Sequence, residues 1–334
     1  MSPAADNGPL IAQVFAQLAD GQFHSGEDLA QQLKVSRSAV WKAVKSLKDL
    51  GATLHAVRNR GYRLARGAEP LDAAKIREQM PRELREHVTA INTAWSVAST
   101  NSELLGRPNP NPGSSEVSLA EYQSAGRGRR GRAWLAPPGG AICLSLSWTF
   151  REVPEDLGAL GLVIGVCALR ALRGLGVQEA CLKWPNDLLI GERKLGGVLI
   201  ELRGESSGPA CVVIGIGLNV ALGATLLKQI AESGTEATDL ADAGAAEIAR
   251  NTVAAALIAE CLRGLVAFAR DGLKPFIAEW RAADALRGRA VDVSSAAGTS
   301  RGLARGIDLH GALLLETPQG VQRFISGDVS VRPG

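Results

Sequence analysis

The chain has 334 residues, 46% of them hydrophobic and 21% charged, a balance that is typical of folded globular proteins and excludes a disordered or fibrous one. Its length is enough for two or three domains. The net charge of only +3 gives no overall field for nucleic acid, so a nucleic-acid-binding function must rest on local charge.

The cysteines are odd in number, widely spaced and without a CxxC pair: Cys143, Cys167, Cys181, Cys211 and Cys261. This pattern predicts reduced, buried thiols rather than disulfides or a zinc site. The polar start lacks the basic and apolar segments of a signal peptide. The longest uncharged apolar run, residues 157–169, is shorter than the roughly 20 residues that a membrane helix needs. We therefore expect a cytoplasmic protein with no membrane span.

The first two elements expected along the chain are short helices. Apolar residues recur at helical spacing over residues 9–18. Ser25 stands before Glu27 and Asp28, the pattern of an N-cap followed by acidic residues in the first turn. We expect the second helix to extend through Leu33.

A third helix and a hairpin complete this N-terminal part. Ser36 is placed to cap the helix, and Trp41 is expected near its apolar face. The apolar positions are Val40, Val44 and Leu47. Residues 53–57 and 61–64 are expected to form two strands about a turn at Asn59. Two short helices, a tight turn and a hairpin together predict a winged helix-turn-helix over residues 1–66.

Local charge supports DNA binding by this domain. Residues 34–66 contain nine lysines and arginines and a single acidic residue, Asp49. Basic side chains on a recognition helix and wing neutralise phosphates. The expected DNA-binding residues are Ser36, Arg37, Ser38, Trp41, Lys42, Lys45, Arg58 and Arg60. The alternative, a basic helix in a protein-interaction module, is less favoured because topology and charge agree.

The sequence after a predicted linker, residues 67–75, mixes helices and strands up to residue 284. Helices are expected at residues 74–79, from about 99, and at 157–175, 250–268 and 273–282. Strands are expected at residues 117–122, 141–148, 182–184, 188–190, 195–202 and 211–220. This order predicts an α+β domain over residues 76–284 with a mixed or mainly antiparallel sheet.

One segment of this domain is dense in arginine and glycine. Residues 126–132 read Gly-Arg-Gly-Arg-Arg-Gly-Arg. Glycines let a backbone approach a ligand closely, and arginines clamp phosphate or carboxylate oxygens. So much positive charge favours disorder until an anion binds, so we predict a loop that folds over a phosphate-containing ligand, with Trp134 covering an apolar group. The alternative is a flexible RNA-binding segment, which the position between two predicted strands disfavours.

A second polar segment follows about fifty residues later. It consists of a Lys-Trp-Pro-Asn-Asp motif around Pro185 and an Arg-Lys-Leu-Gly-Gly motif at residues 193–197. Proline cannot sit in a central ladder, so the first motif marks a special turn. Asn186 and Asp187 are candidates to bind a polar ligand or magnesium, and Lys194 is placed to meet a developing negative charge. Each residue alone is more often a turn former or a solvated charge, but with the arginine-rich loop they predict an anion-handling site.

The last part of the chain, residues 285–334, is expected to be a small SH3-like β-barrel. Its expected strands are residues 291–294, 301–307, 312–316, 321–325 and 329–331. The alternative is an appendage that only stabilises the fold.

The ordered set of motifs resembles the biotin–protein ligase family, and in particular its bifunctional members that also act as biotin-operon repressors. The motifs are Ser99-Thr100-Asn101, Glu121-Tyr122-Gln123 and the segments at 126–132, 183–187 and 193–197. Their order and spacing match over essentially the whole chain, winged head included. The sequence departs from the family at Ala98, which is often an acid, and at Gly196, which is commonly alanine.

The resemblance implies a class II synthetase-like central domain and a role for each motif. Biotin would be bound by Ser99, Thr100, Asn101, Gln123, Arg127, Gly128, Arg129 and Lys194. ATP would be bound by Arg129, Arg130, Arg132, Trp134, Asn186, Asp187 and Asn219. The catalytic residues would be Arg127, Arg129 and Lys194, and Asp187 would bind Mg²⁺.

The implied reaction has two steps, formation of biotinyl-5′-AMP from biotin and ATP and transfer of biotin to a lysine of a biotin carboxyl carrier protein. The two anions of the first step repel each other, which arginines, Lys194 and Mg²⁺ would offset. The resemblance also implies operator DNA as a partner, biotin-responsive repression, and a homodimer promoted by biotinyl-AMP.

Two other functions fit parts of the sequence. A lipoate or octanoate ligase of related fold would handle a similar carboxylate but is not expected to carry this arginine loop with a winged head. A ligand sensor with a decayed active site would lack the arginines, Lys194 or the Asn-Asp pair, and all of these are present.

Overall fold

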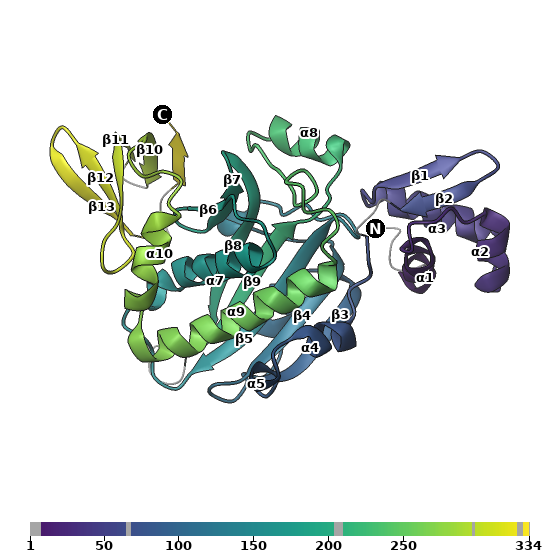
Figure 1. Cartoon of the computed structure of the whole chain (residues 1–334), viewed down its shortest axis with the longest axis horizontal. Helices are drawn as coiled ribbons and strands as arrows, with labels where there is room; N and C mark the ends of the chain where they lie inside the picture. Colours follow the sequence, from purple (N-terminus) through teal and green to yellow (C-terminus); the bar gives the residue numbers. More distant parts are fainter. Residues whose placement is uncertain (1–7, 65–67, 204–209, 296–297, 326–329, 334) are drawn as a thin grey trace.

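The computed structural model describes residues 8–64, 68–203, 210–295, 298–325 and 330–333. Figure 1 shows a small N-terminal head, a large central sheet flanked by helices, and a C-terminal β domain at the end opposite the head. The predicted α+β organisation is therefore confirmed. The proposed limits between the three parts stay predictions, and Arg66 and Gly67, at the first of them, lie outside the described residues.

The head consists of α1 (Gly8–Leu18), α2 (Gly26–Gln32), α3 (Arg37–Asp49) and an antiparallel hairpin of β1 (Leu54–Val57) and β2 (Gly61–Leu64). Both predicted helix caps are formed. The Ser25 hydroxyl accepts a hydrogen bond from the Asp28 N–H at 3.0 Å. The Ser36 hydroxyl accepts one from the Ala39 N–H at 3.2 Å. Asn59 has a φ of 63°, which a small polar residue tolerates in a tight turn.

Trp41 does not lie near the apolar face of α3, so that prediction is wrong. Its side chain is 55% exposed, whereas Val40 and Val44 are buried. One residue beyond Val40 lies about 100° further around a helix, enough to leave the core. Trp41 therefore belongs to the outer surface of the head.

The central sheet has seven strands in the order β3-β4-β5-β9-β8-β7-β6, and among the described strands only β3 and β4 pair in parallel. The strands are β3 (Val88–Val97), β4 (Ser115–Gln123), β5 (Ala141–Phe150), β6 (Ala180–Lys183), β7 (Asp187–Ile190), β8 (Arg193–Arg203) and β9 (Ala210–Asn219). Every residue of β5 is buried. Helices cover both faces of the sheet. On one face lie α7 (Leu160–Gly174) and α9 (Arg250–Asp271), and on the other lies α6 (Thr100–Leu105).

The two long core helices have the length and apolarity of membrane spans. The stretches are Leu157–Gly174 and Arg250–Asp271, and 67% and 61% of their apolar windows are buried inside the fold. The first is longer than its uncharged run because it continues past Arg170. Their packing against each other and against the sheet accounts for their composition, so they are weak evidence for a membrane.

The remaining elements are shorter. They are α4 (Ala73–Gln79), α5 (Arg82–Arg85), α8 (Ala224–Glu232), α10 (Ile277–Ala282) and three single 3₁₀ turns, Arg129–Gly131, Leu157–Ala159 and Lys274–Phe276. Sequence reasoning missed β3, α5 and α8. The edge strand β3 does not alternate between buried and exposed residues, and α8 has no buried residue. β3 therefore carries no strong hydrophobic alternation, whereas α8 has apolar residues at helical spacing, Leu226, Leu227 and Ile230, which sequence reasoning missed.

The C-terminal part is a five-stranded antiparallel sheet in the order β13-β12-β11-β10-β14. Its strands are β10 (Ala290–Ser295), β11 (Gly298–Ile307), β12 (Leu313–Thr317), β13 (Gly320–Phe324) and β14 (Ser330–Pro333). All five predicted strands are found, although Val329, expected to begin the last, lies outside the described residues. The buried indole of Trp184 donates to the Gly311 carbonyl at 3.0 Å and fastens this sheet to the central domain.

The segment that was predicted to be a linker is anchored in its described part. The buried Arg250 guanidinium donates to the Glu69 carbonyl at 2.7 Å and to the Glu121 carboxylate at 2.8 Å. That carboxylate also accepts from the Leu71 N–H at 2.7 Å. Charged hydrogen bonds of this kind are stronger than neutral ones. The chain between head and enzyme domain is therefore held in one path from Glu69 onward.

Candidate active site

The Ser-Thr-Asn motif begins α6 on the side of the sheet opposite α7 and α9. Ser99, Thr100 and Asn101 are 4%, 4% and 3% exposed. Ser99 occupies the N-cap position, but its side chain makes no cap hydrogen bond. The Gln123 carbonyl oxygen accepts instead from the Thr100 N–H at 2.8 Å. Thr100 and Gln123, two of the residues predicted to bind biotin, therefore adjoin each other.

The sheet beneath this motif carries glycines where a side chain would not fit. A Cβ on Gly215 would lie 2.5 Å from Asn101 Oδ1, and one on Gly217 would lie 2.4 Å from Trp134 Cε2. Real Cβ atoms do not approach so closely, so only glycine allows the Asn101 amide and the indole to rest on the strand backbone. This requirement was not predicted, and the Gly-Ile-Gly sequence at 215–217 was the available signal.

The arginine-rich loop forms a narrow hairpin across the same face. The Gly128 N–H donates to the Arg132 carbonyl at 2.7 Å, and the Trp134 N–H to the Gly126 carbonyl at 2.9 Å. Arg130 has a φ of 57° within the 3₁₀ turn. The loop therefore has a defined conformation, in contrast to the disorder predicted before an anion binds. Polar partners for two of its arginines account for the difference.

These partners come from β8 and from the Trp-Pro-Asn-Asp turn. Arg127 pairs with Glu201 at 3.1 Å, and Arg129 donates to the Asn186 side-chain oxygen at 3.3 Å. Arg130 and Arg132 are exposed. Arg127 and Arg129 thus have partners across the site, whereas Arg130 and Arg132 extend toward solvent.

The second motif places a lysine beside a carboxylate. The Trp184–Pro185 peptide is cis, and Asn186 is fixed to the Val198 carbonyl at 2.8 Å. Lys194 Nζ donates to Asp187 Oδ1 at 2.6 Å, with side chains 25% and 23% exposed. The pair is partly shielded yet open enough for a ligand to reach.

Asn219 supports this lysine from below. Its side-chain N–H₂ group donates to the Lys194 carbonyl at 3.3 Å and to the Thr238 carbonyl at 2.9 Å, and the residue is 3% exposed. The predicted contact of Asn219 with ATP stays a prediction. Its observed bonds position the Lys194 backbone.

The two motifs, which are far apart in sequence, converge on one place. Lys194 Nζ lies 5.9 Å from the centroid of a Trp134 ring, and Arg129 reaches Asn186 from the opposite segment. The result is a cationic surface above the glycine floor formed by Gly215 and Gly217, next to the buried polar side chains of Thr100 and Asn101. Such an arrangement can bind an anion and hold its charged groups close together.

The floor also contains a buried thiol. Burial raises the pKa of Cys143 to about 12, so this sulfur is neutral at physiological pH and is a poor nucleophile. All five cysteines are free, as predicted, and four of them are buried. No group of three His, Cys, Asp or Glu side chains that could hold a metal is found in the described ranges. A cation at Asp187 would therefore need oxygens from a ligand as well.

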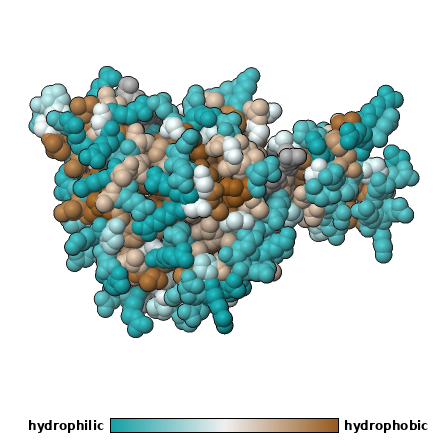
Figure 2. All heavy atoms as spheres, viewed as in Figure 1, coloured by the Kyte–Doolittle hydropathy of each residue, from teal (hydrophilic) through white to brown (hydrophobic). Residues whose placement is uncertain are grey.

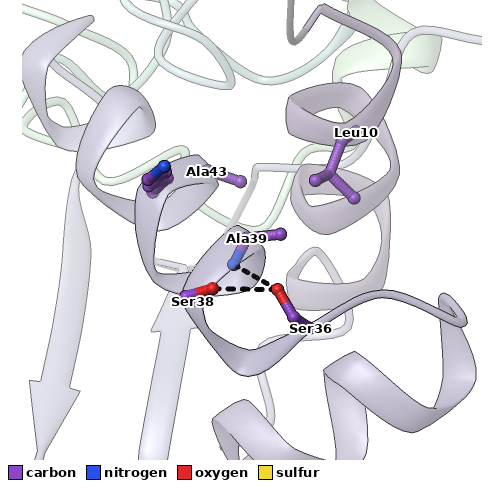
Figure 3. A pocket seen from close by; sticks show the side chains of 6 residues that line it. Leu10, Ser36, Ser38, Ala39 and Ala43 are labelled. Atoms are coloured by element: carbon purple, nitrogen blue, oxygen red, sulfur yellow. Dashed lines mark hydrogen bonds between the residues drawn. The ribbon is translucent and has the colours of Figure 1, made fainter.

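The head carries a second polar surface at the start of α3. The hydroxyls of Ser36 and Ser38 lie 2.9 Å apart at this N-terminus, beside a shallow pocket that Leu10 also lines (Figure 3). Lys45 Nζ lies 5.7 Å from a ring centroid of the exposed Trp41. Hydrophilic side chains dominate the visible face of the head in Figure 2.

A groove separates α3 from the wing of the head. It is lined by Ser25, Gly26, Arg37, Ser38, Trp41, Ala56, Val57, Arg58, Asn59, Gly61 and Tyr62. In the wing, the Arg60 guanidinium lies 4.4 Å from the Phe23 ring centroid. The groove thus brings together predicted DNA-binding residues of both elements, Arg37, Trp41 and Arg58 among them. Ser36, Lys42 and Lys45 lie on or beside the same helix.

Comparison with known families gives a consistent result for each part of the chain. The Biotin/lipoate A/B protein ligase family matches residues 95–219. An HTH domain family matches residues 11–63, and the Biotin protein ligase C terminal domain matches residues 287–332.

Individual proteins are similar over most of their length. The bifunctional ligase/repressor BirA of Escherichia coli (strain K12) is 37% identical over 322 residues, 96% of each chain. The biotin–[acetyl-CoA-carboxylase] ligase of Mycobacterium tuberculosis is 33% identical over 261 residues, 74% of this chain and 94% of the relative. Among solved structures, the biotin protein ligase of Aquifex aeolicus in complex with biotin and ATP superposes with a TM-score of 0.63 at 27% identity, covering 75% of this chain and 100% of the other.

Proposed function

Because the chain belongs to the family of bifunctional biotin–protein ligases and repressors, we propose that it activates biotin with ATP and transfers it to a lysine of a biotin carboxyl carrier protein. The observation that carries the proposal is the convergence of the arginine-rich loop with the Lys194–Asp187 pair, beside Thr100 and Asn101 of α6. The enzyme is a biotin–[acetyl-CoA-carboxylase] ligase on this basis.

Biotin would occupy the space over the glycine floor. Thr100, Asn101 and Gln123 offer hydrogen-bonding groups for the polar ring of biotin. The predicted contacts of Ser99 and Gly128 with biotin rest on the same placement. The biotin carboxylate would then extend toward Arg127, Arg129 and Lys194, whose positive charges favour its approach to the nucleotide.

ATP would lie along the outer side of the loop. Arg130 and Arg132 are exposed and can fold onto phosphates, Trp134 offers an aromatic surface to adenine, and Asn186 borders the same space. Asp187 would hold Mg²⁺ together with phosphate oxygens, and this ion would supply charge neutralisation for the phosphates. Its hydrogen bond to Lys194 supports this placement.

The proposed reaction has two steps, and in each of them one bond forms and one bond breaks. A biotin carboxylate oxygen attacks the α-phosphorus of ATP, and the bond to pyrophosphate breaks, giving biotinyl-5′-AMP. The ε-amino group of the carrier lysine then attacks the biotinyl carbonyl, and AMP leaves with the bonding electrons. Arg127, Arg129 and Lys194 stabilise the negative charge that develops in the first step. A closed loop protects the mixed anhydride from water.

The test is transfer of labelled biotin to the lysine of a purified carrier domain, with and without ATP and Mg²⁺. Labelling that depends on ATP establishes the ligase. Transfer of octanoate or lipoate instead would place the chain in another branch of the same fold. Tight binding of biotin without any transfer would identify a ligand sensor.

For the head, we propose biotin-responsive repression through operator DNA. The groove between α3 and the wing carries the cations and hydroxyls that backbone and base contacts need. One small winged head makes few contacts, so we propose that biotinyl-AMP promotes a homodimer that binds two half-sites. We place the protein in the cytoplasm, where ATP and carrier proteins are available.

The test of this second activity is operator binding measured at several protein concentrations, with biotin plus ATP and without them. Tighter binding and a larger sedimentation coefficient in the presence of both ligands would support repression through a dimer. Binding that is equal with and without the ligands would refute the coupling.

A further inference from the structure

Glu201 connects two segments of the site. It lies on β8, and its Oε2 accepts a hydrogen bond from the Asn101 side-chain N–H₂ group at 2.7 Å. Its Oε1 pairs with Arg127 at 3.1 Å. One carboxylate therefore joins Asn101 of α6 to the arginine-rich loop. No resemblance or motif pointed to it from the sequence.

The charge of this carboxylate fixes the direction of the neighbouring hydrogen bonds. An ionised carboxylate accepts only, so Asn101 must present its N–H₂ group to Glu201. The Asn101 carbonyl oxygen then faces Ser145, whose hydroxyl donates to it at 2.6 Å. Because that hydroxyl has one proton, its 2.7 Å contact with the Thr100 hydroxyl is made with the threonine as donor, so the threonine proton is not available to Gln123 Oε1, which lies 3.2 Å away.

The result is a one-way chain of donors from Thr100 through Ser145 and Asn101 to Glu201. Its members Thr100, Asn101 and Ser145 are 4%, 3% and 0% exposed, so little water competes for these bonds. Buried chains of this kind polarise each member and hold the side chains in one rotamer. Without the negative charge at its end, the Asn101 amide can turn over and reverse the chain.

We propose that Glu201 is a positioning residue that sets the hydrogen-bond direction of the biotin pocket and holds the arginine-rich loop closed through Arg127. The pocket part rests on the proposed function, because it assumes that biotin binds beside Asn101. The loop part rests only on the contacts of Glu201. The residue touches neither biotin nor ATP in this proposal and acts through Asn101 and Arg127.

A second ion pair in the same domain provides a matched control. Arg107 and Glu116 lie 3.2 Å apart with side chains 34% and 26% exposed, and the corresponding values for Arg127 and Glu201 are 3.1 Å, 40% and 26%. The Arg107 pair contacts no residue of the proposed site. Loss of the carboxylate charge at Glu116 therefore costs a comparable ion pair without touching the pocket.

The experiment compares the wild type with Glu201→Gln, Glu116→Gln and the conservative Glu201→Asp, all as full chains. Limited trypsin digestion without ligands reports cleavage after the arginines of residues 126–132. Glu201→Gln should be cut there about fivefold faster, because a partly exposed ion pair restrains a segment by about that factor. Thermal melting of each variant verifies that its fold is intact.

Calorimetric titration with biotin is the second arm. Glu201→Gln should bind biotin about tenfold more weakly, the effect of a lost hydrogen bond to a charged group. Glu201→Asp should recover part of both effects, and Glu116→Gln should show neither. If Glu201 had a structural role alone, both Glu201→Gln and Glu116→Gln would melt at a lower temperature. The two variants would then have the same loop-cleavage rate and the same biotin affinity.

Two results would overturn the proposal: a cleavage rate of Glu201→Gln equal to that of the wild type, or a biotin affinity unchanged by this substitution. A wild type that binds no biotin would instead refute the proposed function. The cleavage arm needs no ligand and would still decide whether Glu201 holds the loop.

Discussion

The arginine-rich loop and the basic face of the head both concentrate positive charge, but they hold it in different ways. In the loop, Arg127 pairs with Glu201 and Arg129 reaches Asn186, each across the site to another strand or turn. In the head, Arg37 lies 3.6 Å from Glu27 with both side chains more than 70% exposed, and Arg60 stacks on an aromatic ring.

The difference corresponds to two kinds of anion. A small ligand with few charged groups must be met by cations at fixed positions, since misplacement by 1 Å is costly in catalysis. A DNA backbone is a long array of phosphates, and mobile, hydrated cations adapt to it while releasing counterions. The loop is built for geometry, and the head is built for summed charge.

The largest effect is expected from an arginine that belongs to neither region. Arg250→Leu leaves the Glu121 carboxylate buried without its partner, since the two side chains are 0% and 7% exposed. We expect a loss of about 3–5 kcal/mol in the free energy of unfolding, measured by urea denaturation. The control Arg263→Leu removes an arginine that is 44% exposed and should cost less than about 1 kcal/mol. Equal losses of unfolding free energy in the two variants would show that the burial of an arginine does not determine its contribution to stability here.

Lys194→Ala tests the fixed cations of the site. Removal of one preorganised charge should lower kcat/KM for adenylate formation by about 10²–10³-fold, with little change in melting temperature because the side chain is 25% exposed. The measurement is ATP–pyrophosphate exchange that depends on biotin. The exposed Lys274, replaced by alanine, is the control. Normal turnover of Lys194→Ala would remove this residue from the mechanism.

Arg60→Ala tests the exposed cations of the head. The loss of one phosphate contact should weaken binding to DNA of any sequence and make the slope of log K against log salt less negative by about 1. Fluorescence anisotropy at several salt concentrations measures the slope. Arg82→Ala, exposed outside the head, should leave it unchanged. An altered slope for biotin binding in Arg60→Ala would contradict the separation of the two regions.

The smallest effect concerns the floor beneath the loop. Burial raises the pKa of Cys143 to about 12, against which the nearby Arg250 charge is the smaller influence. A raised folded-state pKa contributes stability that is present below the unfolded value of about 9. That contribution is lost as pH rises toward about 12. Urea denaturation between pH 8 and 10.5 should therefore show a decline that Cys143→Ala reduces. An identical decline in the variant would mean that the thiol ionises as easily in the fold as outside it.

The sequence predicted those elements of the fold that have a signal within a few neighbouring residues. Ser25 and Ser36 indicated where their helices begin, because an N-cap depends only on a residue and the backbone N–H three residues later. The buried strands β5 and β9 were predicted from continuous apolar runs. The edge strand β3 does not alternate between buried and exposed residues, so only its pairing with the rest of the chain reveals it, whereas the apolar face of α8 was a local signal that was missed.

Residue types and spacing alone predicted an anion-handling site and a DNA-binding head, and the resemblance to a known family supplied biotin and ATP as the ligands. Arginines among glycines, a lysine after a Trp-Pro-Asn-Asp turn and a basic winged head required no knowledge of contacts, because the chemistry belongs to the side chains themselves. Tertiary structure decided which of those groups meet. The Glu201 carboxylate, the glycines under Asn101 and Trp134, and the Arg250–Glu121 pair join residues far apart in sequence. Such contacts depend on strand register and helix placement, which no local stretch of sequence encodes.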